Sequence, residues 1–330
     1  MIERITRQRL EDLLNASTGR RIAVIGDAML DVYLRGEVDR ISPEAPVPVV
    51  RVTERKLALG GAANVANNVV SIGASCELVS AIGDDAAGST LREMLKKVKT
   101  ETRSLVSVDR PTTTKTRVLA RSQQLVRYDE ENDSDLAGDE IARLMEAVEN
   151  ALSEAHALVL EDYNKGVLVP SVIEKAIGWS KQRNIPVVVD PKYRNFFAYG
   201  GATIFKPNRR EMEAALGAAV DIDHPDSLPA TFERLGVEHL LLTLGERGMA
   251  LLSKDGEVGR IPTTAREVYD VVGAGDTVTA YLATTLAAGG TPAEAALVAN
   301  FAAGVEVGKL GAATVTPAEV LEAYDDFVGN

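Results

Sequence analysis

The sequence predicts an α/β fold in which a mainly parallel central sheet is covered by helices on both faces. Short apolar runs recur along the chain and end in polar or glycine-containing turns, as buried strands do. Helical patterns lie between many of them, and this alternation is typical of a parallel sheet with crossover helices. The expected strands include 21–27, 76–81, 157–160, 186–190, 203–206, 239–244 and 249–253, and the expected helices include 3–16, 139–153, 170–183 and 209–216.

Two stretches break this alternation and predict a small β lid. Residues 33–57 carry three prolines beside a valine-rich run, and residues 111–130 are rich in Thr and Val with little helical period. Proline is tolerated only at edge or irregular strand positions. We therefore expect a lid assembled from these two insertions in a core formed by 1–32, 58–110 and 131–330. Uncovered strand edges in the lid predict a homodimer that forms through it.

The bulk composition excludes several classes of protein. A formal net charge of −12 over 330 residues argues against nucleic acid as the main partner. No run reaches 18 apolar residues, and the charged start lacks the apolar segment of a signal peptide. We therefore expect a cytoplasmic chain with no membrane partner. The single cysteine, Cys76, cannot form an internal disulfide and is expected to be buried.

A short glycine-containing turn, Gly273-Ala274-Gly275-Asp276, leads into an alanine-rich helical pattern. A helix start offers unpaired N–H groups and a partial positive charge, and glycine lets those groups approach an anion closely. Asp276 in the first turn is placed to accept the proton of an attacking hydroxyl. The same residues also fit a plain helix entry with the aspartate as its cap. The motif alone therefore predicts an anion site without deciding its chemistry.

A second glycine pair, Gly60-Gly61, precedes another helical pattern, which carries Asn64. The side chain of Asn64 can form hydrogen bonds with hydroxyl groups. Asp27 and Asp31 follow the first expected strand, and open α/β sheets bind their ligands beyond the carboxyl ends of the strands. These five residues are therefore expected to hold a polar substrate that is rich in hydroxyl groups.

The two glycine motifs, in this order, resemble the two signatures of the ribokinase-like (PfkB) carbohydrate kinases. The resemblance spans about residues 22–317 and implies a ribokinase-like fold with phosphoryl transfer from ATP. Residues 206–211 look like the family's Asn-x-x-Glu element. That likeness implies that Asn208 and Glu211 organise Mg²⁺, mostly through water, whereas a helix cap with a first-turn acid is the alternative interpretation.

The same resemblance implies the other nucleotide contacts. Residues 243–248 look like the loop beside the nucleotide phosphates, and residues 300–308 resemble the helix and loop that flank adenine. Asp270 is implied as a ligand of a monovalent cation such as K⁺. A P-loop is excluded, because residues 304–309 have one residue too few between the glycines and Leu310 replaces the required Ser or Thr. The implied ATP-binding residues are Lys206, Asn208, Glu211, Thr243, Gly245, Gly248, Asn300 and Ala303.

Further stretches are similar to the heptose 7-phosphate kinases of ADP-heptose biosynthesis, a part of lipopolysaccharide inner-core synthesis. This likeness implies phosphorylation of the anomeric (C1) hydroxyl of D-glycero-D-manno-heptose 7-phosphate, by a standalone kinase form. Arg117 and Lys192 are the main candidates for the substrate's phosphate, followed by Arg121 and Arg194. The planar donors of an arginine suit phosphate. The stretches that carry the likeness are 40–50, 111–117, 123–127, 162–168 and 190–192.

The expected reaction is in-line phosphoryl transfer. Asp276 deprotonates the acceptor hydroxyl, and the amides of Gly273, Ala274 and Gly275 stabilise the developing charge. Two alternatives stay open. A kinase of the same family could act on ribose, a fructose phosphate or a nucleoside, which a panel of acceptors would decide. A regulator that kept the fold would bind a sugar or nucleotide without turning over ATP.

Overall fold

The computed structural model describes residues 5–121, 123–222, 228–265 and 267–329. Its main sheet consists of β1 (Arg21–Gly26), β4 (Ser75–Gly83), β5 (Leu105–Val108), β8 (Ala157–Glu161), β9 (Val187–Asp190), β10 (Ile204–Phe205), β11 (His239–Thr243), β12 (Met249–Ser253) and β13 (Val258–Ile261). The nine strands lie in the order β13-β12-β11-β10-β9-β8-β1-β4-β5. Neighbours from β11 to β5 are parallel, which confirms the predicted α/β class. Strand β12 pairs antiparallel with both β11 and β13, and this edge is the departure from a fully parallel sheet.

Helices cover both faces of this sheet because the strands are apolar on both sides. Ile22 and Val24 of β1 pack into one core, and the intervening Ala23 packs into the other. The first core is covered by α1 (Arg7–Ser17), α2 (Ala62–Ser71), α3 (Ala86–Lys97), α8 (Ala274–Ala287), α9 (Pro292–Glu306) and α10 (Pro317–Val328). The second is covered by α4 (Gly138–Leu152), α5 (Pro170–Gln182), α6 (Arg209–Leu216) and α7 (Leu228–Leu235).

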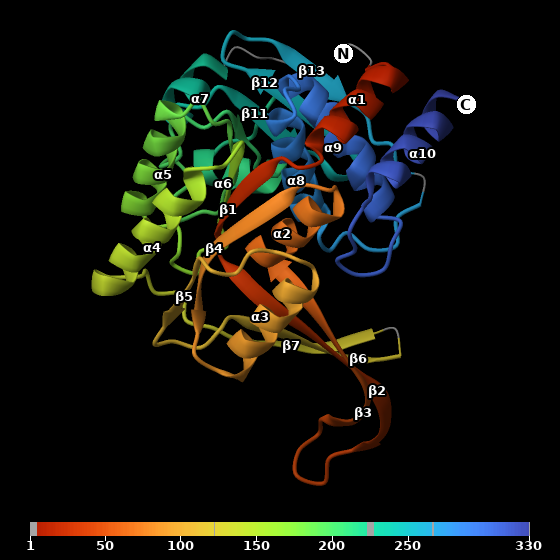
Figure 1. Ribbon diagram of the computed structural model, residues 1–330. Helices are drawn as coiled ribbons and strands as arrows, with labels where there is room; N and C mark the ends of the chain where they lie inside the picture. The colour runs from red at the N-terminus through yellow and green to blue at the C-terminus, as the bar shows by residue number, and fades with distance from the viewer. Residues whose placement is uncertain (1–4, 122, 223–227, 266, 330) are drawn as a thin grey trace.

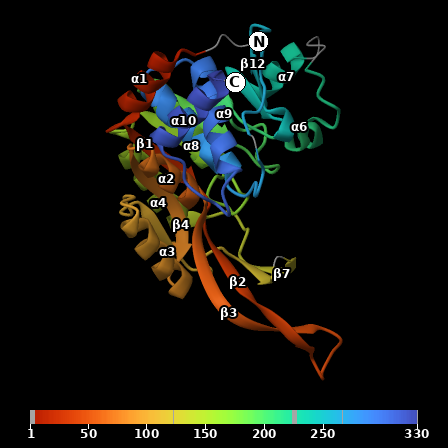
Figure 2. The same ribbon diagram turned by 90° about the vertical axis from the view of Figure 1, so that its right-hand side faces the viewer.

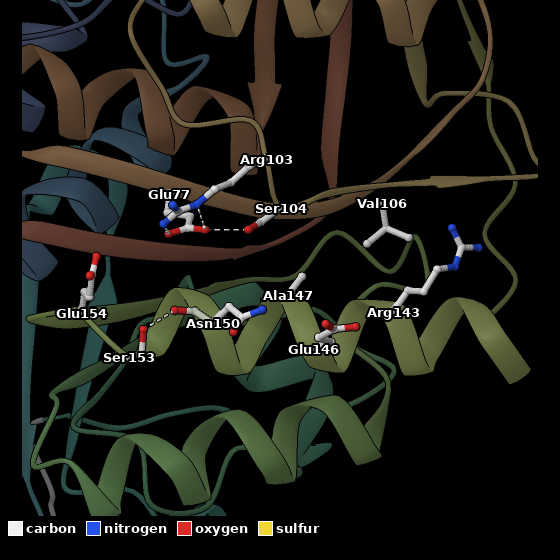
Figure 3. A pocket seen from close by; sticks show the side chains of 10 residues that line it. All are labelled: Glu77, Arg103, Ser104, Val106, Arg143, Glu146, Ala147, Asn150, Ser153 and Glu154. Atoms are coloured by element: carbon white, nitrogen blue, oxygen red, sulfur yellow. Dashed lines mark hydrogen bonds and ion pairs between the residues drawn. The ribbon is translucent and has the colours of Figure 1, made fainter.

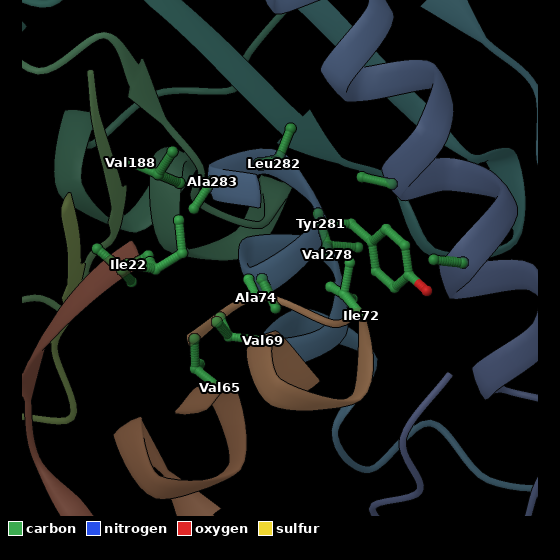
Figure 4. Close-up of a cluster of buried hydrophobic side chains, with 14 of the residues drawn as sticks. Ile22, Val65, Val69, Ile72, Ala74, Val188, Val278, Tyr281, Leu282 and Ala283 are labelled. Atoms are coloured by element: carbon green, nitrogen blue, oxygen red, sulfur yellow. The ribbon is translucent and has the colours of Figure 1, made fainter. Parts of the chain in front are cut away.

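The first core fixes the position of α8, the helix that follows the second glycine motif. Tyr281 and Val278 of α8 pack beside Ile72 and Ala74, at the end of α2 (Figure 4). The hydroxyl of Tyr281 is also satisfied, because it donates to the backbone oxygen of Val315 at 2.9 Å. The alanine-rich composition lets α8 lie close to α2 and α9. The starts of α2 and α8, which carry the two glycine motifs, are thereby held next to each other.

Several local predictions can be compared with the structure. The helices expected at 139–153, 170–183 and 209–216 are α4, α5 and α6. The helix expected at 3–16 begins only at Arg7, because Thr6 is its N-cap and accepts from the Arg9 amide; residues 3 and 4 lie outside the described residues. Cys76 is buried, as predicted. In the described part of the chain, no helix is long and apolar enough to cross a membrane.

A second, four-stranded sheet extends away from the body of the molecule (Figures 1 and 2). It consists of β2 (Ala28–Ile41), β3 (Pro48–Gly61), β6 (Thr114–Ala120) and β7 (Gln123–Glu130), in the order β3-β2-β6-β7. We call this sheet the lid sheet. Its strands β2 and β3 reach further into the core than the expected stretch 33–57. Asp31, Gly60 and Gly61 therefore belong to the lid sheet itself, at the end that meets the core.

Candidate active site

The carboxyl ends of the parallel strands bring four ionisable side chains together. Glu161 ends β8, Asp190 ends β9, Lys206 follows β10 and Asp27 follows β1. Because these strands are parallel neighbours, the residues at their carboxyl ends meet along one edge of the sheet. All four side chains are buried, and Lys206 Nζ donates to Asp190 Oδ2 at 2.7 Å. This edge therefore gathers several ionisable groups in a buried position, inside a protein that is already acidic overall.

Helix α8 begins beside this edge and presents Asp276. Gly273 is the N-cap of α8 and has a φ of +97°, a left-handed conformation that glycine adopts without strain. Asp276 is only 6% exposed, and its carboxylate accepts from Asn64 Nδ2 at 2.7 Å and from the Tyr163 hydroxyl at 3.0 Å. The carboxylate is thus engaged by side chains and does not cap the helix. The two glycine motifs, far apart in the sequence, meet through Asn64 and Asp276.

Burial is the main cause of an altered acidity at Asp276. It raises the pKa of Asp276 to about 6, with a further contribution from the charge of Asp190, while the hydrogen bonds from Asn64 and Tyr163 favour the ionised form. A carboxylate with this pKa is ionised at neutral pH and remains basic enough to take a proton. A general base works best when its pKa lies near the operating pH. Asp276 therefore has the acidity expected of a catalytic base.

Glu161 is the most unusual group at this edge. Its side chain is fully buried, and neither carboxylate oxygen has a hydrogen-bond partner. Burial, followed by the charges of Asp190 and Asp276, raises the pKa of Glu161 well above its ordinary value. One carboxylate oxygen from each of these three residues lies within 4.8 Å of the others. Such a group is stabilised by a proton or by a cation.

Tyr163 contacts Asp276 directly, so its hydroxyl has a testable effect on acidity. Replacing Tyr163 with Phe removes a hydrogen bond that favours the ionised carboxylate, and the pKa of Asp276 should rise. With Asp276 as the predicted base, activity needs its ionised form, so kcat/KM should rise with pH through about 6 in the wild type. In Tyr163→Phe we expect this acid limb to move by up to about one unit toward higher pH. Tyr128→Phe, on the exposed part of β7, is the matched control, and an unmoved limb in both variants would contradict the assignment.

A cavity of about 90 Å³ lies beside Asp276. Gly60 and Gly61 line this cavity. Glycine is needed at both positions, because the Cβ atom of a larger residue would collide with its neighbours. A Cβ atom on Gly60 would lie 2.7 Å from Asp31 Oδ2, and one on Gly61 would lie 2.4 Å from the backbone oxygen of Asp27. The predicted residues that line the cavity are Asp31, Gly60, Gly61, Asn64, Arg117, Gly273 and Asp276, and Lys115 and Tyr163, which the sequence did not single out, line it with them.

Asp27 is not among the residues that line this cavity. Its carboxylate accepts from the backbone amides of Tyr163, Lys165 and Val167, at 2.8, 3.0 and 3.2 Å. Asp27 therefore holds the loop that presents the Tyr163 side chain. The direct substrate contact that the sequence predicted for this residue stays a prediction, and the observed contacts give Asp27 a supporting role in addition.

The predicted nucleotide element at 206–211 adopts a helix-capping geometry. The Asn208 side chain accepts from the Glu211 amide, and the Glu211 carboxylate accepts from the Asn208 amide, both at 2.9 Å. This capping box at the start of α6 is the alternative interpretation raised above, and the proposed metal role stays a prediction. Glu211 also forms an ion pair with Lys192. Lys192 is thus already neutralised by a neighbour.

The other predicted nucleotide residues surround this element or lie further along the same edge. Thr243 forms a parallel bridge with Asn208, which places the loop after β11 beside α6. Lys206 points into the buried carboxylates. Asn300 is buried and donates to the backbone oxygen of Pro262 at 2.9 Å. Gly245 is exposed, Gly248 is buried with a positive φ, and Ala303 is half-buried on α9.

Asp270 ties the loop before α8 to the segment after α9. Its carboxylate accepts from the amides of Val272 and Gly311, at 3.0 and 3.1 Å. Glu306 lies close by, fully buried, and neither of its carboxylate oxygens has a hydrogen-bond partner. Burial and then the charge of Asp270 raise the pKa of Glu306 to about 8. Two neighbouring carboxylates, one of them unsatisfied, are an environment that a cation would stabilise.

A larger hollow of about 520 Å³ lies elsewhere, between α4 and the β4–β5 region (Figure 3). Glu77 and Arg103 on its wall form an ion pair, and Glu77 also pairs with Arg21. These partners, acting against burial, lower the pKa of Glu77 to about 2. None of the motif residues lines this hollow. The smaller cavity beside Asp276, where the sequence motifs converge, is therefore the candidate active site.

Comparison with known proteins decides the family. The model of the pfkB family of carbohydrate kinases matches residues 20–319. The chain belongs to this family. The predicted family and the sugar kinase class are thereby confirmed.

Among curated relatives, the bifunctional protein HldE of Pelobacter propionicus is 45% identical over 320 residues, which cover 96% of this chain and 66% of the relative. HldE of Geobacter sulfurreducens is 43% identical, with 96% and 65% covered. The chain thus spans just under two thirds of these relatives' length.

Solved structures confirm the ribokinase-like fold of this pfkB kinase. Arabidopsis thaliana ribokinase, complexed with ribose and ATP, matches with a TM-score of 0.72 at 21% identity, over 93% of this chain and 98% of that chain. Escherichia coli phosphofructokinase-2, in complex with potassium, matches with a TM-score of 0.75 at 18% identity, over 95% and 100%. At these identities the likeness concerns the fold alone.

Proposed function

We propose that this carbohydrate kinase transfers the γ-phosphoryl group of ATP to the C1 hydroxyl of D-glycero-D-manno-heptose 7-phosphate. The product is the 1,7-bisphosphate, which serves ADP-heptose synthesis for the lipopolysaccharide inner core. Asp276 carries the proposal, because it lies at the start of α8, is held by Asn64 and Tyr163, and is buried, which raises its pKa to about 6. The choice of sugar is supported by the similarity to the HldE relatives over 96% of the chain and by the heptose-kinase-like stretches of the sequence.

The proposed mechanism uses the chain's own groups as follows. Asp276 accepts the proton of the C1 hydroxyl as that oxygen attacks the γ-phosphorus. The bond from the γ-phosphorus to its bridging oxygen breaks, and ADP leaves. The amides of Gly273, Ala274 and Gly275 lie at the positive end of α8, where they stabilise the charge of the transferring group. Asp31, Asn64 and the backbone of Gly60 and Gly61 orient the sugar.

The residues present fit the Mg²⁺ that accompanies ATP. The unpartnered oxygens of Glu161 and the neighbouring Asp190 carboxylate are ligands of the kind Mg²⁺ prefers, directly or through water. Asn208 and Glu211 are proposed to complete the site through water. When bound, the ion neutralises charge on the nucleotide phosphates. The Asp270–Glu306 pair likewise fits a monovalent cation such as K⁺, because it leaves a buried carboxylate unsatisfied.

The lid sheet is proposed to close over the substrate and to join two copies of the chain. The lid sheet contributes Asp31, Gly60, Gly61, Lys115 and Arg117 to the lining of the cavity, so its movement would open or enclose the substrate site. The outer part of the lid exposes Ile41 and Val47 at 62% and 51%. We expect light scattering at micromolar concentration to give twice the chain mass of 35.2 kDa. Ile41→Lys should shift the protein toward monomer, and a wild-type monomer would contradict the dimer.

The assigned reaction is tested by identifying its product. The chain is incubated with ATP, Mg²⁺ and the heptose 7-phosphate, and the mixture is followed by ³¹P NMR. We expect ADP together with a new phosphate ester on C1, while the phosphate on C7 is retained. Phosphorylation of another hydroxyl would overturn the proposed position. ATP turnover only with ribose, fructose 6-phosphate or a nucleoside would assign another acceptor, and tight binding without turnover would indicate a regulator.

A further inference from the structure

Lys115 is a cation at the cavity that has no acidic partner of its own. It lies on β6, two residues before Arg117, and both side chains line the cavity beside Asp276. Residues two apart on a strand point to the same face, so the lid sheet directs both cations toward the site. Lys115 is half-buried, and burial lowers its pKa. Its ammonium lies 5.1 Å from the centroid of the Tyr163 ring.

Each carboxylate whose charge affects the pKa of Lys115 already forms an ion pair with another basic side chain. The three are Asp31, Asp129 and Glu131. Arg117 holds Asp31 at 2.5 Å, Arg127 holds Asp129 at 3.0 Å, and Lys165 holds Glu131 at 2.8 Å. Among the described residues, no ion pair or hydrogen bond engages the Lys115 ammonium. A half-buried ammonium that is left over in this way is a site for an anion from outside the chain.

The other basic residues that the sequence offered for a substrate phosphate are less available. Lys192 is paired with Glu211, and Arg194 is paired with Asp133. Arg121 is exposed at the turn between β6 and β7, outside the lining of the cavity. Arg117 lines the cavity, but it shares its charge with Asp31. Lys115 is therefore the cation at this site whose charge is least compensated.

We propose that Lys115, supported by Arg117, binds the phosphate group that the sugar acceptor already carries. The inference rests on the proposed function, in which that acceptor is a sugar phosphate. Tyr163 sets the spacing, because its hydroxyl contacts Asp276 and its ring lies near the Lys115 ammonium. The Tyr163 side chain thus lies between the hydroxyl that reacts at Asp276 and the anion bound at Lys115. This separation suits a sugar that carries its phosphate at the end remote from the reacting carbon.

The position of Lys115 in the fold favours the phosphate of the sugar over the phosphates of ATP. Lys115 pairs across the lid sheet with Asp31, beside Gly60 and Gly61, where the sugar is proposed to bind. The proposed nucleotide elements lie around Asn208 and Thr243 instead. A phosphate of ATP and a phosphate of the sugar offer the same chemistry, so the experiment has to separate them.

Lys115→Met keeps the length of the side chain and removes its charge. We expect the KM for the heptose 7-phosphate to rise about 10- to 100-fold, the scale of a lost charge-assisted hydrogen bond, while the KM for ATP stays unchanged. Lys115→Arg should restore part of the affinity. Lys56→Met makes the same charge change on the exposed part of β3 and should leave both KM values unchanged. A rise in the KM for ATP alone would assign Lys115 to the nucleotide and overturn the proposal.

A binding measurement separates this inference from the proposed reaction. If the wild type turns over no heptose 7-phosphate, the proposed function fails, and Lys115 is then tested by calorimetry with fructose 6-phosphate and inorganic phosphate. Binding by the wild type that is lost in Lys115→Met supports the anion site. Equal heats for the two proteins, including no heat from either, overturn it. Circular dichroism of each variant during thermal unfolding verifies that it is folded.

Discussion

Asp276→Asn should lower kcat by about 10²- to 10⁴-fold, the usual scale for loss of a general base. The amide keeps the shape of the carboxylate but cannot take the proton of the acceptor hydroxyl. The variant should be no less stable than the wild type, because burial already disfavours the charge of Asp276. Loss of activity with an unchanged melting temperature is therefore the expected combination.

The control for this variant is Asp255→Asn, which makes the same change on an exposed turn between β12 and β13. It should retain the wild-type kcat. Stopped-flow or coupled measurement of ADP release gives kcat for all three proteins. A kcat of Asp276→Asn close to that of the wild type would remove Asp276 from its role as the base.

Asp27→Ala should lower the free energy of unfolding by about 3 kcal/mol or more. Three backbone amides lose their acceptor, and each unsatisfied buried donor costs about 1–3 kcal/mol. The loop from Tyr163 to Val167 would lose its anchor, and kcat should fall because the Tyr163 hydroxyl no longer holds Asp276. Urea unfolding measures the loss of stability, and Asp27→Asn, which keeps one acceptor oxygen, should lie between the two proteins.

This experiment also decides between two roles for Asp27. The sequence predicted that Asp27 contacts the substrate, and in that case the main effect of its loss would be a raised KM for the sugar. The observed contacts predict a loss of stability instead. An unchanged free energy of unfolding with a raised KM would support the substrate role.

The fold was predictable because it depends on short-range patterns. The apolar runs that form β1, β8 and β9 are bounded by clear turn signals, and the helices between them show regular apolar spacing. The extent of the lid was less predictable. Strands β2 and β3 continue past the proline-rich stretch into the core. The sequence pattern of their inner ends does not differ from that of the core, so these residues were assigned to the core and not to the lid.

The site was predictable where it depends on glycine. Gly60 and Gly61 must be glycine because of close contacts, and Gly273 because of its left-handed backbone. Such requirements produce glycine motifs that can be recognised in the sequence. Lys115 and Tyr163 carry no such signal, because only the folded chain brings them beside Asp276. The Asn208–Glu211 pair could not be decided from the sequence, since an N-cap residue with Glu three positions later is also the pattern of a capping box.

The most direct test of the proposed activity is kcat/KM for ATP-dependent turnover with three acceptors: heptose 7-phosphate, fructose 6-phosphate and ribose. The proposal predicts the highest value for heptose 7-phosphate, and a lower value for ribose because it has no phosphate for Lys115 to bind. A value for ribose or fructose 6-phosphate that equals or exceeds the value for heptose 7-phosphate would contradict the proposed substrate.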